Sequence, residues 1–344
     1  MNSSDCTVSL FSVRGVNNFS QSTVSLSHQL HPERILFPHH LEMKIFMLPT
    51  IVCFIAAIVV TPPILFSIFS SFSMRKETRF LLLGNALVSD LTYLFLYTTA
   101  CIFNMTDMQI PKHVCTLLLF FLAATYGGGV LTAAGMVVDT YLAILWPLHY
   151  LLILPLSRAK KLIALLWFSS FSFSGVLFSV LYFTQKPAPC QPNLCSVPVI
   201  LVMTLHGDHA IRLFHILFIT GFLLCFSMIL CCYLFLCYKT RESGLWKGAS
   251  SRANVTFLMH HIILVFHFCP VLLLLADSLL YINNVIGLQT GMLITVTICN
   301  ILIVLPKGVS PYLYGFRYRA IYKSLRLFCK FKRHSLVATD HNFI

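Results

Sequence analysis

Apolar residues follow one another in seven long runs along this chain, separated by short polar connections, with neither the alternation of half-buried strands nor an internal repeat. A helix needs about 20 mostly apolar residues to cross a bilayer. The pattern therefore predicts seven membrane-spanning helices, with the first kinked but kept at Pro62 and Pro63. The predicted spans are Ile45–Ser71, Phe80–Phe103, Val114–Leu145, Leu162–Phe183, Ala210–Tyr238, Val255–Tyr281 and Gly287–Tyr314.

The composition agrees with a membrane protein. Hydrophobic residues make up 58 % of the 344 residues and charged residues 10 %, and the mean hydropathy is +0.83. A soluble domain averages about 45–50 % apolar and about 25 % charged residues. This excludes a soluble globular domain, a disordered chain and a coiled coil, and it predicts an all-α membrane protein built as one seven-helix bundle.

Lysine and arginine lie mostly on one side of the seven spans. Of the 24, 17 fall after spans one, three and five or in the C-terminal tail, whereas the opposite connections carry little beyond Lys112 and Lys186. Basic connections stay in the cytosol, so the N-terminus is predicted outside the plasma membrane and the C-terminus inside. The net charge of +13 then reflects topology. We expect the lipid bilayer, and no nucleic acid, as its partner.

Four regions follow from this topology: an extracellular tail (1–44), a transmembrane domain (45–315), an amphipathic interfacial helix (316–331) and a cytoplasmic tail (332–344). Apolar residues recur at helical spacing on one face of the interfacial helix and basic residues on the other. Cys329 beside the apolar face is a candidate for lipidation or a plain structural cysteine. Three N-x-[ST] sequons on the outer side predict glycosylation at Asn2, Asn18 and Asn104.

Several short motifs occur in order at fixed spacing: Leu81–Asp90 (LLLGNALVSD), Asp139–Ile144 (DTYLAI) with Trp146–Leu148, Trp167, and Ser310–Tyr314 (SPYLY). Together they resemble the rhodopsin-like (class A) G-protein-coupled receptors over about residues 45–329. Residues 305–307, 315–319 and 243–246 resemble one group of orphan receptors within that family, and residues 147–150 resemble odorant receptors.

The resemblance implies a cell-surface receptor that passes an extracellular signal to a heterotrimeric G protein or arrestin. No catalytic constellation or metal cluster occurs in the sequence, so neither an enzyme nor a cofactor is expected. A binding or scaffold protein of the same fold with little G-protein activation is the alternative. A transporter would need paired repeats and broken helices, and neither is found.

The family's activation motifs correspond here to a set of residues that departs from the family pattern at several places. Thr140 replaces the arginine of D-R-Y, Ser310 replaces the asparagine of N-P-x-x-Y, and Cys225 replaces the fifth-helix proline. Because threonine lacks the long five-donor fork of arginine, weak or atypical coupling is expected. The set is Asp139, Thr140, Tyr141, Tyr233, Phe268, Pro270, Ser310, Pro311 and Tyr314.

The family position of Cys115 implies a disulfide to the outer loop between spans four and five. Cys190 and Cys195 are both candidates, and the remaining cysteine would stay free or pair with Cys6. In the family, the counterpart of Asp90 binds sodium with help from the seventh helix. Lys307 occupies one of the helping positions here, so an intramembrane ion pair between Asp90 and Lys307 is predicted.

The ligand pocket can also be placed by family position. Leu122 stands where amine receptors carry an aspartate, so a cationic amine has no obvious counter-ion there. The mostly apolar wall favours an apolar or lipid-like ligand, or else the packed interior of a bundle without a dedicated ligand. The pocket positions are Leu119, Leu122, Ala123, Tyr126, Leu217, Gly221, Phe268, Val271, Leu272, Leu275, Asn300 and Val304.

Overall fold

The computed structural model describes most of the chain between the two tails. In this part the secondary structure is helical apart from the connections. The described stretches are residues 40–106, 110–145, 149–184, 195–206, 209–242 and 251–317. The sequons at Asn2 and Asn18, Cys190, Cys329 and nearly all of the predicted interfacial helix lie outside them.

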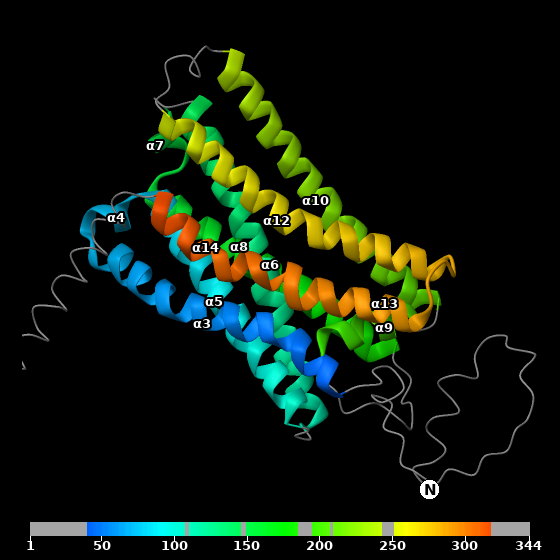
Figure 1. Ribbon diagram of the computed structural model, residues 1–344. Helices are drawn as coiled ribbons and strands as arrows, with labels where there is room; N and C mark the ends of the chain where they lie inside the picture. Colours follow the sequence, from blue (N-terminus) through cyan, green and yellow to red (C-terminus); the bar gives the residue numbers. More distant parts are fainter. Residues whose placement is uncertain are drawn as a thin grey trace, which may run out of the picture.

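Long helices lie alongside one another in a single bundle, with short helices at their ends (Figure 1). The second long helix, α5, is central because it packs against four others, α3, α6, α8 and α14. The elements are α3 (His40–Ser70), α4 (Phe72–Lys76), α5 (Thr78–Met105), α6 (Lys112–Leu145), α7 (Tyr150–Ile153), α8 (Leu156–Thr184), α9 (Val197–His206), α10 (His209–Glu242), α12 (Ser251–Ile282), α13 (Leu288–Thr297), η2 (Ile298–Leu302) and α14 (Val304–Arg317).

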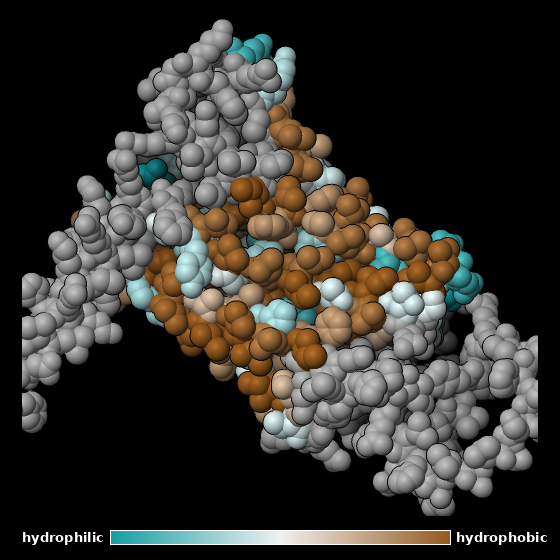
Figure 2. Space-filling view, viewed as in Figure 1, coloured by the Kyte–Doolittle hydropathy of each residue, from teal (hydrophilic) through white to brown (hydrophobic). Residues whose placement is uncertain are grey.

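Six stretches within the described residues are long and apolar enough to cross a membrane, and they correspond to predicted spans one to four, six and seven. The fifth predicted span falls within α10, whose 34 residues extend for about 51 Å at 1.5 Å per residue. The all-α, seven-helix prediction is therefore confirmed. Brown, hydrophobic side chains cover most of the described face in Figure 2. The exposed large hydrophobic side chains of the bundle include Val59 and Phe66 of α3.

The first span remains one helix through both of its central prolines. α3 extends from His40 to Ser70 with Pro49, Pro62 and Pro63 inside it. Proline has no N–H, so Pro62 and Pro63 leave the carbonyls four residues earlier without their helical hydrogen bonds. Membrane helices tolerate this loss when neighbours support the backbone. α3 meets that condition because it packs against both α5 and α14.

Polar side chains connect three helices near the middle of the bundle. Asn85 of α5 donates from Nδ2 to Thr132 Oγ1 of α6 at 2.7 Å, and its Oδ1 accepts from Trp167 Nε1 of α8 at 2.9 Å. Gly128 of α6 faces the Trp167 ring so closely that an added Cβ would lie 3.2 Å from it. The two motif residues Asn85 and Trp167 therefore fix how α5, α6 and α8 pack.

The seventh span is divided into α13, the π-helical turn η2, and α14. The π turn contains Asn300, whose Oδ1 accepts from the Tyr97 hydroxyl at 2.7 Å and whose backbone oxygen accepts from Thr50 Oγ1 at 3.4 Å. A π turn inserts one extra residue into a helix and is common at functional sites. Here it joins the seventh span to both α3 and α5.

Candidate functional site

The end of the bundle near α9 is tied to α6 by a disulfide. Cys115 bonds to Cys195, with the two Cα atoms 5.5 Å apart and a sequence separation of 80. The predicted bridge from Cys115 is confirmed, and of the two candidate partners the structure selects Cys195. A bridge of this kind is typically worth about 2–4 kcal/mol because it restricts the unfolded chain.

The side-chain amide of Asn104, at the end of α5, makes two hydrogen bonds to the same loop. Its Nδ2 donates to the Cys195 carbonyl at 2.8 Å, and its Oδ1 accepts from the Cys195 N–H at 3.2 Å. The sequence identified Asn104 only as a glycosylation site, and sequons alone cannot reveal such a contact. The structure makes Asn104 a positioning residue for the bridged loop.

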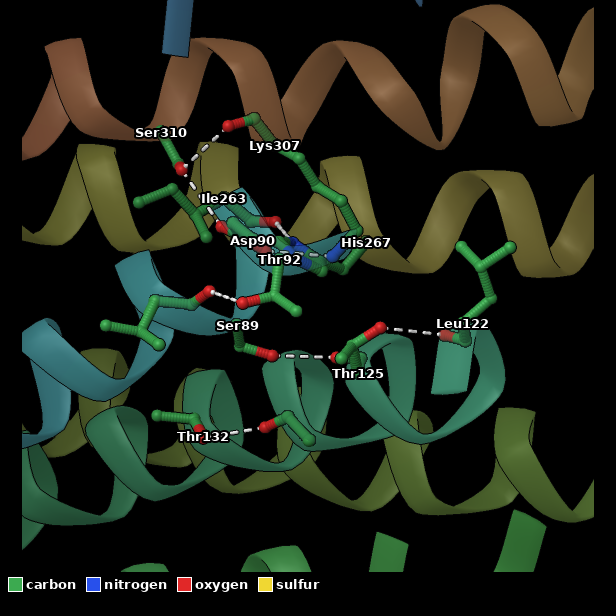
Figure 3. Close-up of polar contacts among 12 residues, drawn as sticks. Ser89, Asp90, Thr92, Leu122, Thr125, Thr132, Ile263, His267, Lys307 and Ser310 are labelled. Atoms are coloured by element: carbon green, nitrogen blue, oxygen red, sulfur yellow. Dashed lines mark hydrogen bonds and ion pairs between the residues drawn. The ribbon is translucent and has the colours of Figure 1, made fainter. Parts of the chain in front are cut away.

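A buried ion pair lies between the second and seventh spans. Lys307 Nζ of α14 lies 2.8 Å from Asp90 Oδ1 of α5, with the lysine side chain 1 % exposed and the aspartate side chain 7 % exposed. Ser310 Oγ donates to Asp90 Oδ2 at 3.0 Å. Figure 3 shows Lys307 and Ser310 extending from one helix toward Asp90, so the sequence-predicted partners lie in contact.

Aromatic rings and a glycine complete the surroundings of the lysine. Lys307 Nζ lies 4.7 Å from the Tyr93 ring centroid and 5.2 Å from that of Tyr126. An added Cβ at Gly129 would lie 3.3 Å from Ser89 Oγ and 3.4 Å from both Lys307 Nζ and Asp90 Oδ1, so α6 approaches the ion pair closely at this glycine. Cation–π contact and a short ion pair together hold the charge without water access.

The C-terminal end of α6 and the start of α7 form a second polar contact. The Tyr150 hydroxyl donates to Asp139 Oδ1 at 2.7 Å, whereas Thr140 Oγ1 turns back to the Met136 carbonyl of its own helix at 2.8 Å. Burial, and after it the hydrogen bond to Asp139, raise the pKa of the Tyr150 hydroxyl above its ordinary value of 10.0. The sequence did not identify Tyr150 as a partner of Asp139.

Most of the predicted pocket positions are interior, and three are corrected. Leu122, Asn300 and Val304 are no more than 2 % exposed, and Leu119 and Val271 are also buried. Phe268 and Leu275 pack at the α10–α12 contact, Tyr126 packs both there and against the Leu119–Leu122 cluster, and Ala123 is half-buried.

The corrected positions are Leu217 and Leu272, which are 60 % and 46 % exposed, and Gly221, where an added Cβ would meet nothing within 4 Å. Ile219 and Leu223 form the contact with α12 instead. Successive residues are about 100° apart around a helix. A two-residue difference in phase therefore turns Leu217 about 200° away from the face that Ile219 occupies.

The remaining activation-motif residues lie within the bundle. Pro270 and Pro311 are buried inside α12 and α14, and Tyr314 packs against Ile64 of the first span. The side chains of Tyr141 and Tyr233 lie outside the described set.

The sequence also missed a polar cluster where α10, α12 and α13 meet. Asp277 Oδ2 accepts from Thr295 Oγ1 at 2.7 Å, and His215 Nε2 lies 3.2 Å from Ser278 Oγ. The available signal was an acid inside an apolar span, which is costly in a membrane and therefore a candidate functional residue.

Comparisons with known proteins agree with this geometry. The family model described as 7 transmembrane receptor (rhodopsin family) matches residues 63–314. Human "Probable G-protein coupled receptor 148" is 26 % identical over 296 residues, which cover 85 % of this chain and 84 % of that protein. Human "Olfactory receptor 4K14" is 25 % identical over 216 residues, which cover 60 % of this chain and 68 % of the relative.

Proposed function

We propose that this chain, which belongs to the rhodopsin family of seven-transmembrane receptors, places the Lys307 ammonium beside Asp90 where the family resemblance implies a sodium ion. The chain is a multi-pass membrane receptor of class A. With its N-terminus outside and its C-terminus inside, it would transmit an extracellular ligand signal to a G protein, arrestin or another cytoplasmic transducer. The transmission is a population shift between two arrangements of the bundle.

The ion pair of Asp90 and Lys307 is the observation that carries this proposal. A covalently attached ammonium 2.8 Å from Asp90 Oδ1 occupies the place that the family resemblance assigns to sodium. An ion can leave, whereas a lysine stays attached to α14. The pair therefore links α5 and α14 permanently in this arrangement. Removing one partner of a buried pair is expected to cost about 3–5 kcal/mol because the other charge stays buried.

Weak coupling is the second part of the proposal. The Thr140 hydroxyl donates to the Met136 carbonyl of its own helix. Its side chain is too short to reach a transducer as an arginine would. Tyr150 holds Asp139 in place of the missing arginine. The resting contact at this end is therefore kept by a neutral hydroxyl, while the group that would engage the G protein is absent.

Substituting Thr140→Arg tests the coupling proposal directly. Cells expressing equal surface amounts of the unaltered chain and the variant are compared in G-protein dissociation and arrestin recruitment panels. We expect weak signalling from the unaltered chain and a clear increase with Thr140→Arg, while Thr140→Ser stays weak. Robust signalling by the unaltered chain with no gain from arginine would contradict the proposal. If none of the three chains signals, the result would favour the alternative of a scaffold protein with the receptor fold.

A further inference from the structure

One carboxylate near the end of α12 has an unused oxygen. Asp277 is 4 % exposed, and its Oδ2 accepts from Thr295 Oγ1 at 2.7 Å. Its Oδ1 is fully buried and has no hydrogen-bond partner. Buried polar atoms are nearly always satisfied, so such an exception requires a reason. Asp277 Oδ1 therefore lacks the hydrogen-bond donor that a buried carboxylate oxygen normally has.

The other two carboxylates described within the spans are already engaged. Asp90 is paired with Lys307, and Asp139 accepts from Tyr150. Next to Asp277, the Ser278 hydroxyl donates to the Leu274 carbonyl at 2.7 Å and lies 3.2 Å from His215 Nε2. The open acceptor at Asp277 is therefore a local exception in a cluster whose neighbouring contacts are made.

The position of Asp277 suits an approach from the end of the bundle. It lies five residues before α12 ends at Ile282, and the turn that follows, Asn283 to Val285, is exposed. On α13, Gly291 has no side chain to cover the carboxylate, and an added Cβ there would lie 4.0 Å from Asp277 Oδ1. This end also carries α9, which packs against α13 just after the bridged Cys195.

We propose that Asp277 anchors a cationic nitrogen of the ligand, an ammonium or guanidinium group, between α12 and α13. The proposal rests on the receptor topology above, in which this end faces outside. A cation would donate to Oδ1 in a charge-assisted hydrogen bond and neutralise the buried carboxylate. Asp277 of the sixth span then supplies the counter-ion that Leu122 cannot provide for a cationic ligand. The charged group of the ligand binds at the end of the bundle, and the apolar centre receives none.

Thermal unfolding of the purified full chain in detergent tests this without any transducer. The probes are phenethylamine for an ammonium and benzamidine for a guanidinium-like cation, with phenethyl alcohol as the neutral control. We expect at least one cationic probe to raise the melting temperature and the alcohol to have no effect. In the isosteric Asp277→Asn variant, the concentration for half-maximal stabilisation should rise about tenfold or more, since a charged hydrogen bond is lost.

Two further variants separate a ligand site from a structural acid. Thr295→Val keeps the carboxylate and frees its second oxygen, so stabilisation by the cationic probe should persist. Arg212→Gln changes a charge on α10 but leaves Asp277 intact, and should also keep it. Without probe, Asp277→Asn should melt no lower than the unaltered chain. Equal stabilisation of Asp277→Asn, no effect of either cation, or a lower melting temperature of probe-free Asp277→Asn would overturn the proposal. Failure here would leave the coupling result with Thr140→Arg untouched.

Discussion

Single side chains at the two ends of the bundle make contacts that no local sequence pattern specifies. Tyr150 reaches Asp139 across eleven positions of sequence, and Asn104 reaches the Cys195 backbone across ninety-one. Each uses a common residue type in a polar connection, where such residues are usually solvated. At this scale, the family resemblance identified Asp139, Cys115 and Asp90 but could not identify the neutral partners that folding brings to them.

Removing the Tyr150 hydroxyl should loosen the C-terminal end of α6. Tyr150→Phe is expected to lower the free energy of unfolding by about 1–2 kcal/mol, because a hydrogen bond to a carboxylate is lost from a half-buried site. Since the pKa of Tyr150 is raised in the folded chain, this contribution is complete below pH 10 and declines as the pH rises further. Denaturant unfolding measures both effects. Tyr238→Phe, at an exposed tyrosine, is the control, and an equal loss there would refute the assignment.

The effect of the Asn104 hydrogen bonds can be separated from the effect of a sugar attached to Asn104. Asn104→Ala should reduce thermal stability and surface expression, because the bridged loop loses both of its side-chain hydrogen bonds. Thr106→Val destroys the same sequon but keeps the amide, so it should have little effect. Flow cytometry and melting curves, with glycosidase digestion beside them, give the comparison. Equal losses in both variants would assign the effect to glycosylation.

At the scale of elements, the hydrophobic pattern predicted the seven spans because apolar length is a local property. Each long helix lies within a few residues of its predicted bounds, although α3 and α8 begin five or six residues early. The pattern did not predict α9 or the π turn η2. α9 lies in what was expected to be an outer connection, and η2 depends on the contacts of Asn300 with Tyr97 and Thr50. The phase of α10 was taken from family position and was wrong, because Ile219 and Leu223 face α12 and Leu217 does not.

The corrected phase of α10 can be tested with two leucines on that helix. Leu223 is 9 % exposed and contacts α12, whereas Leu217 is 60 % exposed. Leu223→Ala should lower the free energy of unfolding by about 2–5 kcal/mol through lost packing. Leu217→Ala should change it by less than about 0.5 kcal/mol. Unfolding of both variants in one detergent decides the matter, and a greater loss at Leu217 would restore the original pocket assignment.

The whole molecule is a receptor bundle in which an ion pair joins α5 to α14, with the cation attached covalently to α14. The family resemblance led to Asp90 and Lys307 because ionisable residues are rare in membrane spans and need partners. It did not indicate that Tyr93 and Tyr126 would surround the ammonium, since those contacts require the packed bundle. Likewise, Asp277 stood in the sequence as an isolated acid until folding placed it beside Thr295. The fold and the family can be predicted from the sequence, whereas the side-chain contacts of Lys307 and Asp277 depend on the tertiary structure.

A double-mutant cycle at Asp90 and Lys307 tests the central claim most directly. The free energies of unfolding of Asp90→Asn, Lys307→Met and the double variant are measured against the unaltered chain in the same detergent. Each single change should cost about 3–5 kcal/mol. The double variant should lose less than the two singles combined, with a coupling of about 1–3 kcal/mol. Additive losses would mean that the two charges do not stabilise each other, and would contradict the account.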